Sequence, residues 1–582
     1  MRKRLAALLA VLLTASLCLA ACGTEEDGGG GEEELVLTAA LPDGEREDFL
    51  RRHLYENLMR WVDDGDGFAV LAPGQAESCT VETDYTGLAT YTFTLRANAV
   101  WSDGQAVTAG QFADAWRRLA DPASALPGGA LMEQIGGWDQ VQETGDTGLL
   151  AVSAPDDRTL VVTLSGDSAY FLETVCAGPD TVPVRSDLLS GGTMTGTVTN
   201  GPYVLAEAGG DTLRRSETYY DAASVSPAEL KLLPAGNGAE ADFSAALTEE
   251  ELAALAADPD WTPEPVTAVY AAVLNTAEAP FDDPAVRRAF LLAVDEDALT
   301  AALGDSLPRA AEGLVPWGVG DHWQPEDAGE SGTGQDEEPA IPDPGAAQAP
   351  ETAPERWDFR AHSRELVTVP APGDYAAACA EARSLLAQAG YENGRGLPEI
   401  RYVYVPGENA EAAAQALRTM WKEQLGAEVR LTPLSQEEYD ALLYPAGDPE
   451  SADPADAGED AGGEEAAPAF HVAARLLTAP APDACFYLEP FISQDARNAG
   501  GYASDAFDIL MASAAAAISP DAWSARDAYL HDAEAILLSD AAVIPLYCQG
   551  DAYRLAEGLE GLYRGPDGCW YLSAVRRTAA AG

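Results

Sequence analysis

Residues 91–122 read YTFTLRANAVWSDGQAVTAGQFADAWRRLADP and hold the clearest structural pattern of the chain. From Tyr91 to Arg96, aromatic or aliphatic side chains alternate with polar ones, which is the period of a half-buried strand. Thr108 and Gln111 then have the spacing of a capping box. The apolar residues that follow share one helical face: Phe112, Ala115, Trp116 and Leu119. The stretch predicts a strand, a turn at 102–104 and a capped helix that ends at Asp121-Pro122.

Helices and strands of the same style are predicted further along the chain. Asp283-Pro284 has the form of an N-cap followed by proline at the first helical position. The helix after it carries one apolar stripe: Val286, Ala289, Phe290, Ala293 and Val294. Residues 375–389 and 410–425 also predict helices, ended by Gly390 and Gly426, and β-like runs follow them at 400–405 and 427–431. Helices that alternate with strands predict α/β layers.

Two segments lack any such pattern. Residues 324–355 and 447–467 are rich in Asp, Glu, Gly, Ala and Pro and have almost no bulky apolar side chain. Such segments bury too little apolar surface to offset the conformational entropy lost on ordering. We therefore predict two acidic, disordered loops, inserted within one domain.

The N-terminus has the three parts of a secretory signal peptide: Arg2-Lys3-Arg4, an uncharged run over 5–20, and Leu19-Ala20-Ala21-Cys22. Leu-Ala-Ala-Cys resembles the lipobox of bacterial lipoproteins. This resemblance implies a signal peptide at 1–21, a lipidated Cys22 and a flexible tether at 22–34. Ordinary secretion with an incidental cysteine, or an uncleaved anchor, is the alternative. We expect an extracytoplasmic protein, anchored to the outer face of the cell membrane by Cys22.

The charge balance excludes one class of partner. The 582 residues include 34 Lys plus Arg and 96 Asp plus Glu, which gives a formal net charge of -62. Nucleic acid binding requires clusters of Lys and Arg, so no nucleic acid partner is expected. The acidity either attracts cations and cationic peptides or serves solubility alone.

Signatures of catalysis and metal binding are missing. The chain has no G-x-S-x-G, no H-E-x-x-H, no G-x-x-x-x-G-K-[ST] and no C-x-x-C. Its five histidines are far apart in sequence and are interpreted as surface or packing residues: His53, His322, His362, His471 and His531. We predict no catalytic residue, no metal site, no cofactor and no enzyme activity.

Residues 91–122 resemble the signature of the family 5 extracellular solute-binding proteins, the peptide- and oligopeptide-binding proteins of ABC importers. In that signature a strand ending F-x-L-R leads into W-S-D-G-x-x-V-T-A-x-D-F. Further blocks that resemble the family follow in its order: Asn200-Gly201-Pro202-Tyr203, Tyr219-Tyr220-Asp221, residues 280–289, 313–316 and 385–391, Met420-Trp421-Lys422, and residues 542–547. The resemblance implies an α/β, two-lobed periplasmic-binding-protein-like fold (type II, cluster C) with an extra small domain, in which the lobes close over the ligand around hinge strands.

The resemblance also implies a domain division. Lobe I is expected at 35–75, 200–275 and 535–582, the small domain at 76–199, and lobe II at 276–534. The six cysteines of the mature chain then fall into three pairs, one in each unit: Cys79 with Cys176, Cys379 with Cys485, and Cys548 with Cys569. We predict that each pair forms a disulfide, which would leave the hinge free; free buried thiols are the alternative.

Seven polar side chains are the candidate ligand-binding residues: Tyr55, Asn200, Tyr203, Asn275, Asp483, Tyr487 and Tyr502. Packing is the alternative role of each. In several family members an Asp of a segment W-x-x-D-Y-x-D-P-x-x-F-L binds the peptide ammonium, and alignment on Leu488 places Pro480 at that position. A buried, unpaired ammonium is costly. Either Asp483 or another carboxylate replaces that Asp, or the ligand differs.

These features predict a monomeric substrate-binding lipoprotein of an ABC importer. It is expected to capture peptides of the oligopeptide or dipeptide class between its lobes and to deliver them to permease and ATPase subunits in the membrane. The alternatives are a peptide-sensing or regulatory surface lipoprotein and a binder of a non-peptide solute. A surface hydrolase has no motif in its favour.

Overall fold

The computed structural model describes residues 34–578, with breaks at 43, 64–68, 84–87, 125, 127, 167–170, 191–192, 259–260, 262, 305–306, 322–356, 363–365, 371–372, 445–469, 480–482, 518–522 and 566–567. Several predictions lie outside the described residues. These are the signal peptide, Cys22 and nearly all of the tether, both acidic loops, and the position of Pro480.

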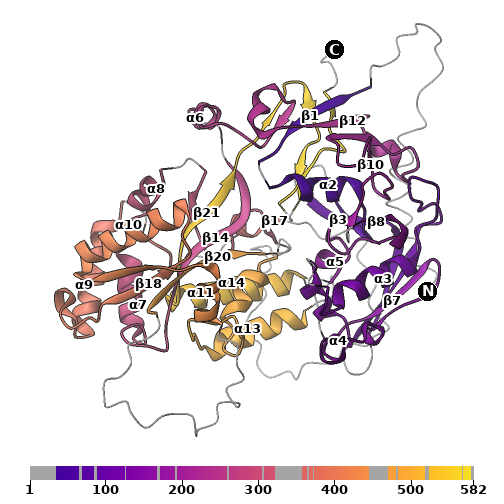
Figure 1. The fold of residues 1–582 in the computed structure, drawn as a ribbon. Helices are drawn as coiled ribbons and strands as arrows, with labels where there is room; N and C mark the ends of the chain where they lie inside the picture. The colour runs from indigo at the N-terminus through magenta and orange to yellow at the C-terminus, as the bar shows by residue number, and fades with distance from the viewer. Residues whose placement is uncertain are drawn as a thin grey trace.

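Two bodies of sheet and helix make up the structure (Figure 1). We call residues 34–263 and 552–578 the N-lobe and residues 264–551 the C-lobe. The chain enters the C-lobe along β14 (Glu264–Leu274) and leaves it along β21 (Val543–Asp551). These two strands pair antiparallel, from Glu264 opposite Asp551 to Val273 opposite Val543. Two neighbouring strands therefore connect the lobes.

The N-lobe contains a six-stranded sheet in the order β10-β11-β12-β1-β13-β22. Its strands are Tyr203–Leu205, Thr212–Arg215, Glu229–Leu233, Val36–Ala40, Phe243–Ser244 and Arg554–Leu555 in that order. A four-stranded antiparallel sheet, β4-β5-β7-β6, consists of Ala76–Thr83, Ala89–Leu95, Thr159–Thr163 and Val152–Asp156. One continuous apolar core joins the two sheets, since Leu37, Phe93 and Leu230 belong to the same buried cluster.

Shorter elements complete the N-lobe. Its two-stranded ribbons are β2 (Met59–Asp63) with β3 (Ala69–Pro73), β8 (Leu189–Ser190) with β9 (Thr193–Met194), β23 (Leu559–Glu560) with β26 (Arg576–Arg577), and β24 (Tyr563–Arg564) with β25 (Trp570–Tyr571). Its helices are α2 (Arg46–Leu54), α3 (Ala109–Ala120), α4 (Trp138–Thr144), α5 (Phe171–Thr174) and α6 (Glu249–Ala256).

The C-lobe is built on a mixed sheet in the order β15-β21-β14-β20-β18-β19. The strands other than β14 and β21 are β15 (Arg309–Ala310), β20 (Val472–Thr478), β18 (Ile400–Tyr404) and β19 (Val429–Pro433). β14 is apolar on both sides: Tyr270 and Ala272 enter one core, whereas Val269 and Ala271 enter another. A strand buried on both faces lies between two layers of helices.

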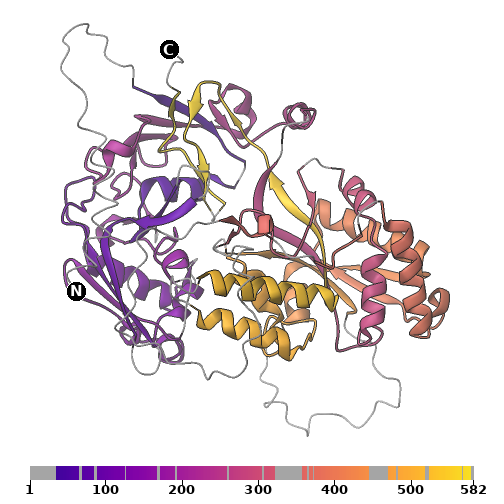
Figure 2. The ribbon, with the colours of Figure 1, turned by 180° about the vertical axis from the view of Figure 1, so that it is seen from behind.

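The two helical layers are separate in sequence and in space (Figures 1 and 2). One core contains residues of α7 (Pro284–Leu292), α8 (Glu296–Leu303), α9 (Tyr375–Gln388) and α10 (Glu408–Leu425). The other contains residues of α12 (Cys485–Leu488), α13 (Asp505–Ala516) and α14 (Trp523–Ser539). A smaller core lies under α11 (Gln436–Leu443), and β16 (Gly320–Asp321) pairs with β17 (Trp357–Asp358).

The strand, turn and helix predicted over 91–122 are confirmed. β5 ends at Leu95, Gly104 has the left-handed φ of 84° that a turn glycine supplies, and α3 begins with a capping box in which the Thr108 N–H donates to Gln111 Oε1 over 3.1 Å. The helices predicted at 284, 375 and 410 are also present. The strand predicted from 427 begins instead at Val429.

The predicted domain borders divide elements that the structure keeps together. Residues 264–275 and 535–551 were expected in lobe I, yet β14 and β21 are strands of the C-lobe sheet. We propose that the lobe borders lie near 264 and 551, at the outer ends of these strands. The small domain at 76–199 remains a proposal, and it shares its core with the rest of the N-lobe.

The structure corrects the prediction of three disulfides. Cys79, Cys176, Cys379 and Cys548 are free thiols in the described structure, and each predicted pair contains at least one of them. Cys379 lies on α9 and Cys485 on α12, in the layers on opposite sides of the C-lobe sheet. Cys548 lies on β21, whereas Cys569 lies beside β25 in the N-lobe.

The two thiols of the first predicted pair lie in the same unit and are free as well. Cys79 and Cys176 both contact the N-lobe core. Burial raises the pKa of the Cys79 thiol to about 12 and raises that of Cys176 as well. Burial therefore disfavours the reactive thiolate at both positions.

Candidate functional site

A cavity of about 410 Å³ lies between the lobes. Its N-lobe wall includes Asp48, Arg52 and Trp61, and its C-lobe wall consists of residues 266–268 at the start of β14 and 478–479 at the end of β20. The volume is within the range of small-ligand sites. A molecule bound there would contact both lobes, so we call this space the interlobe cavity.

A second cavity, of about 440 Å³, lies within the N-lobe. It shares Arg52, Trp61 and residues 177–179 with the interlobe cavity. The stacked rings of Tyr563 and Tyr571, 4.9 Å apart, also line it, and the Tyr563 hydroxyl donates to the Trp61 carbonyl over 3.0 Å. These contacts hold the C-terminal ribbon against β2.

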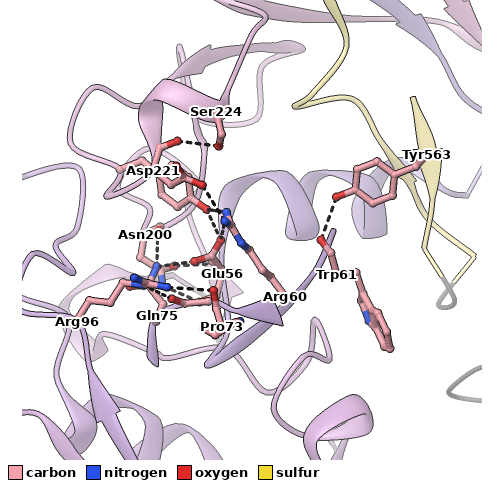
Figure 3. Close-up of polar contacts among 12 residues, drawn as sticks. Glu56, Arg60, Trp61, Pro73, Gln75, Arg96, Asn200, Asp221, Ser224 and Tyr563 are labelled. Carbon is pink, nitrogen blue, oxygen red and sulfur yellow. Dashed lines mark hydrogen bonds and ion pairs between the residues drawn. The ribbon is translucent and has the colours of Figure 1, made fainter. Parts of the chain in front are cut away.

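A polar network lines the N-lobe cavity (Figure 3). The buried Glu56 carboxylate accepts a short hydrogen bond from the Tyr219 hydroxyl. Arg60 donates to the Tyr219 oxygen over 2.9 Å and to Asp221 Oδ2 over 2.7 Å, and it lies 3.8 Å from Glu56. Burial raises the pKa of Glu56, and the charge of Arg60 opposes this effect. These four side chains are thus bonded to one another.

The same network continues into the scaffold of the N-lobe. Asn200 donates to the Glu56 carbonyl over 2.7 Å, and Gln75 donates to the Asn200 carbonyl over 2.9 Å. The Arg96 guanidinium lies 4.4 Å from the Tyr220 ring centroid and donates to the Gly74 carbonyl over 2.6 Å. Four distant chain segments are held together in this way, which gives the network a structural role.

A third cavity, of about 530 Å³, lies in the C-lobe beside β20. β20 pairs with β14 along its whole length, but with β18 only at Val472 and Ala473, because β18 ends at Tyr404. Among the described residues, 474–478 therefore have no neighbouring strand on that side. Residues 474–476 line the C-lobe cavity, and residues 478 and 479 line the interlobe cavity. The open edge of β20 runs from one cavity to the other.

One hydrogen bond shows which main-chain groups of β20 point away from β14. The Tyr439 hydroxyl donates to the Ala474 carbonyl, and both residues line the C-lobe cavity. The Ala474 carbonyl therefore points away from β14. Main-chain groups of alternate residues in a strand point to the same side. Leu476 and Thr478 thus present their N–H and carbonyl groups to the open edge.

The other walls of the C-lobe cavity carry hydrogen-bond donors. Gly407, Asn409 and Ala410 at the start of α10 line it, and the N-cap Gly407 provides no side-chain cap. Arg475 lines it too, with its guanidinium 5.8 Å from the Tyr444 ring centroid and one N–H donating to the Arg497 carbonyl over 3.1 Å. Arg475 makes no ion pair within the described residues, but Asp495 lies close enough to interact with its charge.

Two tyrosines near this cavity have buried hydroxyls that interact with each other. Tyr270 lines the cavity, stacks on Tyr547 at 4.9 Å and exposes 6% of its surface. Tyr402 is fully buried nearby on β18. Neither hydroxyl makes a hydrogen bond with a third residue among those described, but the two hydroxyls interact with each other; burial raises the pKa of both phenols. Both hydroxyls remain protonated, and each can still donate a hydrogen bond.

The predicted site residues of the N-lobe lie mainly in its scaffold. Tyr55 lines the N-lobe cavity, and its hydroxyl oxygen accepts from the Gly196 N–H over 3.0 Å. Tyr203 is fully buried and donates to the Pro227 carbonyl over 3.3 Å. Asn200 belongs to the network described above.

The predicted site residues of the C-lobe also have protein partners. Asn275 donates to the Phe470 carbonyl over 3.1 Å, Tyr487 to the Thr267 carbonyl over 2.6 Å, and Tyr502 to Asp540 over 2.7 Å. Asp483 accepts from Arg526 over 2.8 Å and from the Cys485 N–H over 2.9 Å. Of the seven candidates only Tyr55 is among the described residues that line the three cavities, and ligand contact by the seven stays a prediction.

The sequence patterns did not identify several residues that line the cavities. Trp61, Tyr270 and Arg475 belong to no block that resembles the family signature. One signal was present: Arg475 is the only charged residue in the apolar strand VAARLLT. A charge in such a strand indicates a face of the sheet that solvent or polar groups can reach.

The described residues offer neither a metal-binding cluster nor a membrane-spanning helix. No cluster of His, Cys, Asp and Glu there could hold a metal ion. No helix in that part of the chain has the length and apolar character needed to cross a membrane.

Two α/β lobes joined by paired strands, with a ligand-sized cavity between them, are the architecture of a solute-binding protein. Residues 70–496 match the family described as bacterial extracellular solute-binding proteins, family 5 (middle region). The chain belongs to this family, and the fold class predicted from the resemblance is confirmed.

The relatives cover most of the chain. The dipeptide-binding protein DppE of Bacillus subtilis (strain 168) is 26% identical over 517 residues, which are 85% of this chain and 82% of DppE. The periplasmic oligopeptide-binding protein OppA of Escherichia coli (strain K12) is 28% identical over 549 residues, 90% of this chain and 87% of OppA. The unliganded open form of the murein tripeptide-binding protein MppA has a TM-score of 0.70 and 21% identity, and covers 94% of this chain and 98% of MppA.

Proposed function

We propose that this protein captures a peptide between its lobes and delivers it to the permease of an ABC importer. The open edge of β20 carries the proposal. An extended peptide can add to this edge as a strand, with its main chain bonded to Leu476 and Thr478. In such binding the strand bonds to the main chain of the ligand, which is the same in every peptide. The cavities then hold the side chains of the ligand. The dipeptide- and oligopeptide-binding relatives support the ligand class.

The proposal includes closure of the lobes. The connecting strands β14 and β21 are the hinge in this mechanism, since the chain crosses between the lobes only there among the described residues. Closure would bring Trp61 and Arg52 of the N-lobe onto a peptide held along β20. The protein acts as a monomer without chemistry of its own. Permease and ATPase subunits are its membrane partners.

The amino end of the ligand is recognised differently from the pattern expected in the family. Pro480 stands at the position of the ammonium-binding Asp, and Asp483 is already bound to Arg526. Asp483 therefore cannot replace the missing Asp without breaking that ion pair, which costs several kcal/mol where the pair is buried. We propose that the ligand has a blocked amino end, or that its ammonium projects away from residues 478–483.

We also propose that the protein is a lipoprotein. The signal peptide at 1–21 and the Leu-Ala-Ala-Cys sequence support cleavage before Cys22 and attachment of lipid to its thiol. The polar residues that follow would then serve as a tether between the membrane and the N-lobe.

Native mass spectrometry of the protein purified from its own membranes tests these proposals together. The intact mass should show a lipidated N-terminus at Cys22 and a retained mass that fragments as a peptide. Pools of synthetic di- to pentapeptides should raise the melting temperature of stripped protein, because a ligand at about 100 times its Kd stabilises by about 2.7 kcal/mol. Retention of no peptide, together with no shift by any pool, would overturn peptide capture.

A further inference from the structure

The two strands that connect the lobes carry facing carboxylates at the lobe border. Glu264 is the first residue of β14, Asp551 is the last residue of β21, and the two lie directly opposite each other in the antiparallel pair. The Cβ atoms of residues in such positions are about 5 Å apart, and like charges placed there repel each other. The chain therefore passes between the lobes at a pair of like charges.

The guanidinium of Arg564, on β24 of the N-lobe, binds one member of this pair. Its Nη2 lies 3.0 Å from Asp551 Oδ2, so this ion pair crosses the lobe border. Its Nε donates to the Gly568 carbonyl over 3.0 Å, and the group lies 5.2 Å from the Trp570 ring centroid. These contacts fix the guanidinium within the ribbon of β24 and β25. Because it is already bonded to Asp551, it can offset the charge of Glu264 only in part.

Two further carboxylates and a phenol interact with these three residues. Glu45, just before α2, interacts through its charge with Asp551 and Arg564, and Asp48 in the first turn of α2 acts on Glu45. The phenol is that of Tyr553, which interacts with the charge of Glu264. Negative charge is therefore in excess at this part of the lobe border.

The ionised form of Glu264 is disfavoured in the folded protein. Burial raises the pKa of this carboxyl; the charge of Arg564 opposes the effect, and that of Asp551 adds to it. A carboxyl with a raised pKa stabilises the folded chain at low pH, and this stabilisation is lost as the pH rises through the raised pKa. Because Glu264 lies at the outer end of β14, the loss is expected at the junction of the two strands.

We propose that the hinge is sensitive to protons: ionisation of Glu264 loosens the outer ends of β14 and β21, and its protonation tightens them. Arg564 limits the loosening because it holds Asp551 against the N-lobe. The proposal rests on the hinge role given to these strands above, but it concerns the protein without ligand. The lobes of the free protein then move more readily at neutral pH than in mild acid.

Hydrogen exchange of the ligand-free protein, followed by mass spectrometry, tests the proposal. Glu264→Gln keeps the size of the side chain and removes its charge. At pH 7.5, peptides that cover residues 264–269 and 548–551 should exchange about two- to fivefold more slowly in this variant, as expected for the loss of a repulsive cross-strand pair. The ratio should approach one as the pH falls to 4.5, because the natural carboxyl becomes protonated. Comparison at equal pH cancels the effect of pH on the exchange chemistry.

Matched variants separate the hinge from the general charge of the protein. Glu82→Gln removes a carboxylate from an exposed position of β4 that faces Thr90, so it should leave exchange at the hinge unchanged. Arg564→Gln should speed exchange of the hinge peptides at pH 7.5, because the carboxylates lose their cation. Arg576→Gln removes an exposed guanidinium of β26 and should not. Equal exchange of β5 in all variants checks that each one is folded.

Two results would overturn the proposal. Equal exchange of the hinge peptides in the natural protein and Glu264→Gln at pH 7.5 would show that ionisation of Glu264 does not loosen the strands. A difference of constant size from pH 7.5 to 4.5 would show that protons do not control it. Because no ligand is present, both results are separate from the peptide-binding tests of the proposed function.

Discussion

His53 shows how a single buried side chain couples the N-lobe to pH. Its ring stacks on Phe49 at 3.9 Å, Nδ1 donates to the Phe49 carbonyl over 2.8 Å, and Nε2 accepts from the Leu572 N–H over 3.2 Å. This pattern fixes the neutral tautomer. Burial lowers the pKa of His53 from 6.5 to about 4. The interpretation of this histidine as a packing residue is confirmed.

His53→Phe should therefore flatten the pH dependence of stability. The unfolded chain binds a proton at this histidine below about pH 6.5, whereas the folded chain does so only below about pH 4, so the stabilisation present above pH 6.5 is lost as the pH falls through this window. Between pH 7.5 and 5 the natural protein should lose about 2 kcal/mol that the variant does not lose.

Thermal unfolding of both proteins at several pH values measures this difference. The variant should start from a lower melting temperature at pH 7.5, because the Leu572 N–H loses its acceptor. The contribution of the many carboxylates is common to both proteins and cancels in the comparison. Parallel curves for the two proteins would contradict a neutral, buried His53.

At the scale of elements, the unequal lengths of β18 and β20 create the site. β18 ends at Tyr404, β20 continues to Thr478, and α10 begins at Glu408 beside the gap. An open strand edge in a protein interior is costly unless a ligand or water completes it. The edge is therefore the feature that most directly indicates an extended ligand.

Leu476→Pro should abolish strand addition while sparing the sheet. The Leu476 N–H faces the open edge, so proline removes a donor that β14 does not use, and edge positions of this kind tolerate proline. Peptide affinity should fall about tenfold or more while the melting temperature changes little. Isothermal titration with a peptide from a binding pool measures the change.

Leu476→Ala is the matched control for that experiment. It removes the same side chain, which is 47% exposed, but keeps the N–H. Its affinity should stay close to that of the natural protein. Equal affinity of the proline and alanine variants would show that the peptide main chain does not bond to this strand.

The elements also show which features can be predicted from sequence. The capping box of α3 and the Asp283-Pro284 start of α7 are local signals, because the interacting groups lie a few residues apart, and both helices begin where predicted. Whether Cys379 can pair with Cys485 depends on the side of the sheet on which each cysteine lies. Their positions in the sequence do not give that side.

The site itself depends on contacts between distant elements. The C-lobe cavity exists because β18 stops short beside β20 and because α11 and β21 border the gap. No local sequence pattern predicts where β18 ends relative to β20. The predicted site residues came from blocks that identify the family, and those blocks largely contain core residues such as Tyr203 and Tyr487, whose hydroxyls are already bonded.

At the scale of the whole molecule, the formal charge of -62 acts on the entire structure. Like charges on one surface repel each other and destabilise the compact state. Salt screens this repulsion: the Debye length falls from about 10 Å at 0.1 M to about 3 Å at 1 M. The stability of this protein should therefore depend on ionic strength.

The melting temperature should rise by a few degrees between 20 mM and 1 M NaCl. The rise follows because salt screens the repulsion among surface carboxylates. KCl and tetramethylammonium chloride should act like NaCl on the melting temperature, since screening depends on charge and not on the identity of the cation. A rise specific to one cation would indicate a bound ion instead.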